Sequence, residues 1–451
     1  MLVAAAFLLW TWLRPTVERV DVLALAERVA GVKHFRVELR DERIGRLVTE
    51  TRVEPAVVRF CSRLVTALPG VGPAEVDETF VFSATAPFAL AHAERIERQG
   101  LLERRVTIVP GPTGYYARIR NGGGDRIEAL DWQYDLAAHL ALESWLASQD
   151  PSVGATLTTN AFDFDRLGLI PTHYVVSERT DDGGWVVRSA ASDDEQILAI
   201  DGDLAPRALS TGDAFLLVRT ERGAPLEFRT RTHAADTRVP LDAAIENPRQ
   251  LVRLTLAGDA RTMEALGVRN TRGELTIDTS TPHSATDAER DAALAPSVDL
   301  PVSSPEILAL LARVPRAAET TAQVDLLLAF VERTLVYDDE TRSLDLTDAL
   351  RTGRGDCTEF ADLFTTLARA LGIPARPANG LVYADIDGPG FYVHAWSEVA
   401  IDGHWVAVDP TSGQRPADAT HVPFPRDGTG FLRAYAALAD MRLSVIAIDH
   451  R

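Results

Sequence analysis

The chain has 451 residues, of which 46% are hydrophobic and 25% are charged, so it is long enough for two or three soluble domains with buried cores. Its formal net charge of −19 at pH 7, with no basic patch, argues against a nucleic-acid partner. Two cysteines exclude a disulfide framework and a cysteine-rich zinc site. Lys33 is the single lysine, which leaves almost no lysine-based chemistry, because arginine cannot be deprotonated to act as a nucleophile.

Residues 1–13 form an N-terminal hydrophobic segment, and residues 14–31 are predicted to form a short helix. The apolar run is shorter than the roughly 20 residues of a spanning helix and resembles the hydrophobic core of a signal peptide, although it lacks the basic start and a clean cleavage site. A signal peptide and an uncleaved anchor are the two interpretations, and the anchor is favoured. Trp10, Trp12 and Arg14 are typical of a membrane boundary. We therefore expect membrane attachment through residues 2–13 and a cell-envelope location, periplasmic or extracellular, for the rest. A docked terminal helix and a cytoplasmic protein are the alternatives.

Residues 32–280 alternate apolar and polar side chains in many short runs, which predicts a β-rich region of one large or two small sandwich-like modules. One helical insertion is expected between Asp131 and Ser148, and Cys61 is expected in the core. Residues 281–304 are polar and contain prolines, so they are predicted to be a linker. Helical patterns return at residue 305, so the chain is predicted to be an α+β protein with its chemistry in residues 305–451.

A helix is predicted from about Cys357 to Leu371, because apolar residues recur there at the spacing of one helical face. Asp356 is a good N-cap, and Gly372 with Pro374 ends the pattern. Cys357 then lies in the first turn, where free backbone N–H groups and the helix dipole favour a thiolate. A buried structural cysteine is the simpler alternative unless a base lies nearby.

Such a base is predicted from a hairpin further along the chain. Asp402-Gly403 separates two alternating runs and is typical of a two-residue turn. In that register Ile401 faces His404, and His394 and Asp409 become diagonal neighbours on one face of the sheet. We expect Cys357 to attack as a thiolate, His394 to carry the proton, and Asp409 to orient the imidazole.

These segments resemble the transglutaminase-like superfamily of cysteine enzymes, in its broad bacterial branch. The resemblance rests on residues 353–376 (GRGDCTEFADLFTTLARALGIPAR), on His394-Ala395-Trp396 and on residues 405–411 (WVAVDPT). It covers about 305–446 and implies a papain-like core with Cys357, His394 and Asp409 as the catalytic triad.

Four further residues are candidates for the oxyanion site or the cleft. The backbone N–H of Cys357 and, more weakly, Tyr337 could stabilise an oxyanion, and Asp356 belongs to the turn before the thiol. Trp396 could form a wall of the cleft, although packing explains it equally well. Glu398 lies on the same face of the strand as His394 and could help to hold the imidazole in place. No cofactor or metal is expected, because the chain has no phosphate-binding loop, no complete calcium loop and no H-E-x-x-H motif.

The expected reaction is acyl chemistry on a peptide or protein substrate through a Cys357 thioester. Hydrolysis, as in a peptidase or amidase, is favoured, and a cross-linking transglutaminase is the alternative. A non-catalytic scaffold that retains the fold is a third hypothesis. The oligomeric state is not predicted.

Overall fold

The computed structural model describes residues 21–39, 42–68, 72–99, 102–121, 124–190, 195–211, 215–220, 238–268, 270, 272–281, 283–338, 346–386, 388–426 and 430–451. The hydrophobic segment 1–13 lies outside these residues, and membrane attachment therefore stays a prediction. Within the described ranges, no helix has the length and apolar character needed to cross a membrane. Of the predicted helix at 14–31, the structure describes α2, Val22–Arg28, which is capped by Asp21.

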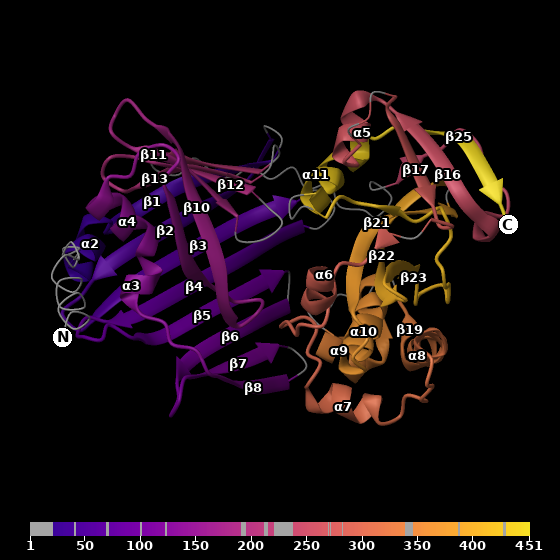
Figure 1. Ribbon diagram of the computed structural model, residues 1–451, viewed down its shortest axis with the longest axis horizontal. Coiled ribbons are helices and arrows are strands. Elements are labelled where there is room, and N and C mark those ends of the chain that lie inside the picture. The colour runs from indigo at the N-terminus through magenta and orange to yellow at the C-terminus, as the bar shows by residue number, and fades with distance from the viewer. Residues whose placement is uncertain are drawn as a thin grey trace, which may run out of the picture.

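A single antiparallel sheet of fourteen strands, called here the N-terminal sheet, forms the β-rich region (Figure 1). Its strands are β1 Gly31–Leu39, β2 Glu42–Val53, β3 Val57–Leu68, β4 Gly72–Ser83, β5 Leu90–Gln99, β6 Leu102–Pro110, β7 Tyr115–Asn121, β8 Gly124–Leu130, β9 Thr156–Asp163, β10 Gly168–Arg179, β11 Trp185–Ala190, β12 Glu195–Ile200, β13 Pro206–Thr211 and β14 Phe215–Thr220. Strands β1–β8 pair in sequence order, and so do β9–β14, while the pairing of β1 with β14 connects these two halves.

One core lies between the two halves of this sheet. Phe82 of β4 and Ile108 of β6 belong to the same buried cluster as Val187 of β11. The predicted helical insertion is confirmed as α3, Leu136–His139, and α4, Ala141–Gln149, whose Trp145 joins that cluster. The region is therefore one large sandwich-like module, which was one of the two expected arrangements. Cys61, expected in the core, is only half-buried on β3.

The C-terminal domain, residues 238–451, is built on a second sheet with the strand order β18-β23-β22-β21-β24, to which β15 adds at β22. These strands are β15 Val239–Pro240, β18 His283–Ser284, β21 Ala375–Asp385, β22 Pro389–Ile401, β23 His404–Val408 and β24 Val422–Pro423. A separate three-stranded sheet contains β16 Leu251–Gly258, β17 Glu274–Asp278 and β25 Leu443–His450. The short parallel pair β19, Val336–Tyr337, and β20, Arg354–Gly355, precedes the main helix.

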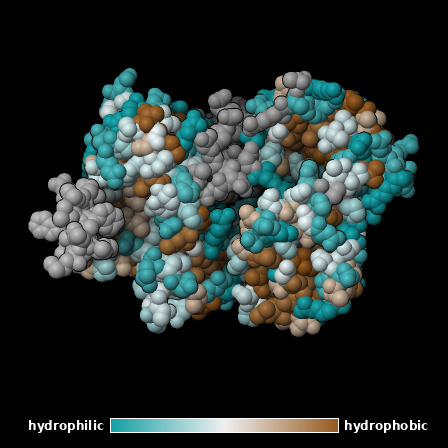
Figure 2. Space-filling model, viewed as in Figure 1, coloured by the Kyte–Doolittle hydropathy of each residue, from teal (hydrophilic) through white to brown (hydrophobic). Residues whose placement is uncertain are grey.

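The described helices of this domain pack into two apolar clusters, except α6, which has no buried residue. Among the described residues they are α5 Ala260–Ala265, α6 Asp287–Ala292, α7 Pro305–Leu311, α8 Thr320–Thr334, α9 Leu346–Thr352, α10 Cys357–Ala370 and α11 Gly430–Ala437. Helices α7, α8 and α10 share one cluster with strands β21–β23, whereas α5 and α11 share the other with β16. In Figure 2 hydrophilic residues cover much of the visible face, as expected from the net charge, and brown patches lie over the lower part of the C-terminal domain.

The structure differs from the predicted boundary at residue 280. Val239 pairs with Phe391, and strand β16 pairs with β25 at the other end of the chain, so these segments complete the C-terminal domain. The predicted linker 281–304 contains β18, which pairs with β23, and the capped helix α6. Alternating apolar and polar residues show that a strand is half-buried, but they do not identify the strand with which it pairs. The sequence pattern therefore could not assign residues 239–284 to the C-terminal domain.

The predicted helix at Cys357 is confirmed. Helix α10 begins at Cys357 after the N-cap Asp356 and ends at Ala370, and Gly372 follows with a φ of 77°. Phe360, Phe364 and Leu367 of its apolar face are fully or almost fully buried against the second sheet.

Replacing the fully buried Phe364 with Ala should destabilise the C-terminal domain by about 3–5 kcal/mol, because it removes apolar contacts and leaves a cavity. The urea dependence of hydrogen exchange in peptides from α10 measures this loss. Leu308→Ala is the matched control, since Leu308 is 50% exposed and its loss should change the stability by less than about 0.5 kcal/mol. Equal effects of the two substitutions would contradict the assignment of this core.

Candidate active site

Cys357 is the first residue of α10, and a capping box fixes the turn before it. The Asp356 carboxylate accepts a hydrogen bond from the Thr358 amide at 2.7 Å, and the Glu359 carboxylate accepts one from the Asp356 amide at 2.7 Å. The half-buried thiol therefore lies at the positive end of a fourteen-residue helix. Asp356 thus acts as a cap that holds the turn.

Helix α10 is fixed to strand β22 by buried hydroxyl groups. The Ser397 hydroxyl donates to the Ala361 carbonyl at 3.0 Å, and the Thr365 hydroxyl lies 3.0 Å from Ser397 Oγ. Because Ser397 has used its single proton, Thr365 is the donor in the second bond. These two bonds, both fully buried, set the position of the helix that starts with Cys357 relative to the strand that carries His394.

The predicted hairpin register is confirmed. Ile401 faces His404 and Ser397 faces Val408, with Asp402 and Gly403 as the two turn residues. Both turn residues have positive φ, 50° and 77°, as a tight hairpin turn of this kind requires.

The regular ladder stops at Ser397 and Val408, so the expected pairing of His394 with Thr411 does not form in it. Asp409 instead makes a two-way backbone bridge with Gln414, which turns the chain. The side chains still meet: His394 Nε2 lies 3.2 Å from Asp409 Oδ2, as predicted. Since a carboxylate only accepts, Nε2 donates, which leaves Nδ1 for an interaction with Cys357, a group that favours the charged form of this ring.

The protonation of His394 follows from its surroundings. Burial favours the neutral ring, but the hydrogen bonds and charges of Asp409 and Cys357 outweigh burial and raise the pKa of His394 to about 9. Burial likewise acts to raise the pKa of Asp409, whereas the hydrogen bonds from His394 and His421 hold that pKa far below its usual range. The site therefore favours an imidazolium and an ionised carboxylate at neutral pH.

Asp409 has partners that the sequence did not reveal. Its Oδ2 also accepts from Ser412 and lies 3.3 Å from Nε2 of His421, and its Oδ1 accepts from the Thr411 amide at 2.9 Å. His421 is buried and also contacts Asp418 through Nδ1. The only sequence signal was a further histidine in the C-terminal domain, at the start of the short apolar run His421-Val422-Pro423-Phe424.

Strand β24 carries His421 into the site. Val422 pairs with Leu381 and Pro423 with Gly380, which itself lies opposite His394 on β22. A Cβ atom at Gly380 would lie only 2.1 Å from the Val422 carbonyl oxygen. Glycine at this position therefore allows β24, and with it His421, to approach the sheet.

Trp396 and Tyr337 take different places. Trp396 is 1% exposed, stacks on His394 with ring centroids 6.3 Å apart, and meets His421 edge-on at 5.3 Å. It therefore packs against both imidazoles, which is the packing role left open by the sequence. Tyr337 pairs with Gly355 and is 52% exposed, so it lies beside the turn that leads to Cys357. Its role as an oxyanion donor stays a prediction.

Glu398 does not serve as expected. Its carboxylate pairs with Arg376 at 2.9 Å and with Arg426, and Arg376 in turn stacks on the Trp405 ring. The strand parity was right, but the cationic side chains nearby determine where the carboxylate points. Glu398 holds an ion-pair network beside the site instead of supporting His394.

One group among the described residues has the donor atoms for a metal ion: His394, Asp409 and His421, within 4.8 Å of one another. The same three atoms already take part in hydrogen bonds with one another. An ion there would have to displace these bonds and both ring protons, so the donor set is better explained by proton sharing.

The site therefore combines a thiol at the start of a helix with an imidazole and a carboxylate on neighbouring segments. Residues 309–410 match the family model of the transglutaminase-like superfamily, so the C-terminal domain is transglutaminase-like, as the sequence resemblance indicated.

Comparison with curated proteins found no match. Among solved structures, a β-barrel-like protein of a domain family of unknown function from Brucella abortus is 12% identical, with 42% of this chain and 98% of that chain covered and a TM-score of 0.30. A candidate cysteine protease from Cytophaga hutchinsonii is 16% identical, with 48% and 83% covered and a TM-score of 0.28. Such low TM-scores do not indicate a shared fold.

The stability of the protein should depend on pH through this cluster. His394 and His421 both have a pKa raised to about 9, so their contribution is complete below the unfolded value of about 6.5 and is lost as the pH rises through about 9. We expect the free energy of unfolding to fall by on the order of 6 kcal/mol between pH 6.5 and 9.5, about 3 kcal/mol for each imidazole. Urea unfolding across this range measures the change.

Asp409→Asn is the control for this prediction, because it keeps the shape of the side chain but removes the charge that both imidazoles face. The decline above pH 6.5 should largely disappear in this variant. If the variant shows the same dependence of the free energy of unfolding on pH, this cluster does not cause that dependence.

Proposed function

We propose that the protein performs cysteine-dependent acyl chemistry on peptide or protein amides through a Cys357 thioester, with hydrolysis as the favoured outcome. The observation that carries the proposal is the position of His394, which donates to Asp409 at 3.2 Å and whose charged form is favoured by both Asp409 and Cys357. The family match at residues 309–410 supports the same chemistry.

The reaction would begin with attack of the Cys357 sulfur on the amide carbonyl carbon, while the carbonyl oxygen takes up negative charge. The backbone N–H of Cys357 at the start of α10 can donate to that oxygen, and Tyr337 is the second candidate donor. His394, charged in the resting pair, gives its proton to the leaving nitrogen as the C–N bond breaks. A thioester and a neutral imidazole remain.

The second half of the reaction depends on the acceptor. Water, deprotonated by His394, would attack the thioester carbon, release a carboxylic acid and restore the thiolate and the imidazolium. A primary amine in place of water would give a new amide, which is the cross-linking alternative. Both routes need the same three residues.

Cys357 should be alkylated rapidly by iodoacetamide at pH 6, where an ordinary thiol is ionised only to about 0.3%. In a Cys61→Ala background, which leaves one thiol, we expect a rate about a hundredfold above that of the same protein unfolded in urea. Mass spectrometry of the labelled peptide gives the rate.

His394→Ala should return this rate to that of an ordinary thiol, whereas His404→Ala in the same hairpin should not change it. If Cys357 is alkylated slowly in the protein that retains His394, and the rate does not change in His394→Ala, the basis for acyl chemistry is removed. The scaffold hypothesis would then be favoured.

The acceptor can be identified by incubating a reduced, unfolded casein with the enzyme, with and without a fluorescent alkylamine. Hydrolysis predicts new peptide termini or glutamine converted to glutamate, detected by mass spectrometry, and little amine incorporation. Incorporated amine as the main product would establish the cross-linking alternative. Cys357→Ala should abolish either product, which separates the reaction from contaminating proteases.

A further inference from the structure

We propose that His421 is a positioning residue of the thiol site: a buried imidazolium that holds the Asp409 carboxylate and balances its charge, so that Asp409 orients His394 without trapping its proton. This inference rests on the function proposed above. It concerns a residue outside the Cys357, His394 and Asp409 set.

The first step is the charge of His421, which follows from its two neighbours. Nδ1 lies 3.1 Å from the Asp418 carbonyl oxygen, and Nε2 lies 3.3 Å from Asp409 Oδ2. A carbonyl oxygen and an ionised carboxylate can only accept, so both ring nitrogens must donate. A neutral imidazole has one N–H and leaves one contact unmade, whereas an imidazolium makes both.

The second step is that Asp409 is ionised. Its two oxygens face four donors: Nε2 of His394, Nε2 of His421, the Ser412 hydroxyl and the Thr411 amide. A protonated carboxyl group would place a hydrogen against one of them. Asp418 faces His421 on the other side, with its Oδ1 3.5 Å from Nδ1, so one buried cation lies between two carboxylates.

The third step is the effect on His394. A buried carboxylate with a single imidazole partner holds the imidazolium form strongly, which hinders release of the proton to a leaving group. The ring centroid of His421 lies 5.9 Å from that of His394, with Trp396 packed against both rings. A second positive charge at this distance opposes the charge on His394 and so makes its proton easier to give up.

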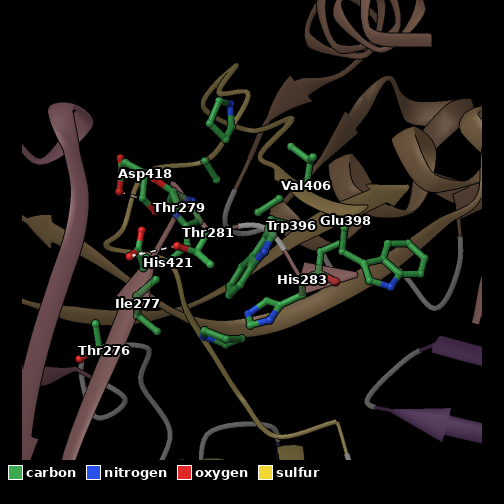
Figure 3. Close-up of a pocket in the computed structure, with 16 residues that line it drawn as sticks. Thr276, Ile277, Thr279, Thr281, His283, Trp396, Glu398, Val406, Asp418 and His421 are labelled. Atoms are coloured by element: carbon green, nitrogen blue, oxygen red, sulfur yellow. Dashed lines mark hydrogen bonds and ion pairs between the residues drawn. The ribbon is translucent and has the colours of Figure 1, made fainter. Parts of the chain in front are cut away.

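The other ionisable residues around His421 do not determine its protonation. His421, Asp418 and Trp396 line one pocket (Figure 3), and its other ionisable residues are Asp278, His283 and Glu398. Asp278 is bonded to Arg253, and Glu398 to Arg376 and Arg426, so both acids already have cationic partners. Burial opposes a charge on His421, but the bonds to Asp409 and Asp418 outweigh it and raise its pKa to about 9.

The test uses His421→Gln, whose amide can still donate to Asp409 but carries no charge. The ratio of Cys357 alkylation by anionic iodoacetate to alkylation by neutral iodoacetamide reports whether His394 is protonated. We expect the pH at which this ratio falls to rise by about one to two units in the variant, because a like charge has been removed. His404→Gln, the same change at a histidine outside the cluster, should leave the midpoint unmoved.

A second measurement needs no substitution at His421. Nitrogen-15 NMR of the wild-type rings should show both nitrogens of His421 protonated from pH 5 to 8. A single protonated nitrogen at pH 7, or a folded His421→Gln protein with an unmoved or lowered midpoint, would overturn the inference.

Failure of the proposed function has a different signature. In that case wild-type Cys357 reacts as an ordinary thiol that is indifferent to His394, whatever the charge state of His421. The two hypotheses are therefore decided by separate observations on the same protein.

Discussion

The site depends on one carboxylate that is shared by two imidazoles. Asp409 is 2% exposed, and a buried charge of this kind persists only when hydrogen bonds and opposite charges compensate for the lost water. His394, His421, Ser412 and the Thr411 amide supply this compensation together. The protonation of His394 follows from how this charge is distributed.

The fold holds this arrangement in place from two directions. The bonds of Ser397 and Thr365 fix α10, and hence Cys357, to β22. From the other side, β24 adds to β21 beside Gly380 and holds His421 against Asp409. Cys357 and His394 therefore lie on regular elements, whereas Asp409 lies on a turn that is held by its bridge to Gln414.

The parts of the structure that the sequence predicts are those determined by local spacing. The apolar period fixed α10 and placed Cys357 at its start, and the Asp402-Gly403 turn fixed a register that brought His394 to Asp409. His421 could not be found in this way, because it follows an irregular segment whose path depends on tertiary contacts. The same limit applies to strand β16, whose partner β25 lies nearly two hundred residues further along the chain.

The strand pairing of residues 239–284 has a practical consequence for work on the C-terminal domain. The family match begins at residue 309, and a fragment cut there would lose β15 and β18 from the second sheet and β16 and β17 from the third. Leu251, Leu254 and Leu256 of β16, all fully buried, would leave the cluster that also contains Leu381 and Phe391. The smallest autonomous unit should therefore start before Val239, because the segment between the two recognisable regions belongs to the C-terminal domain.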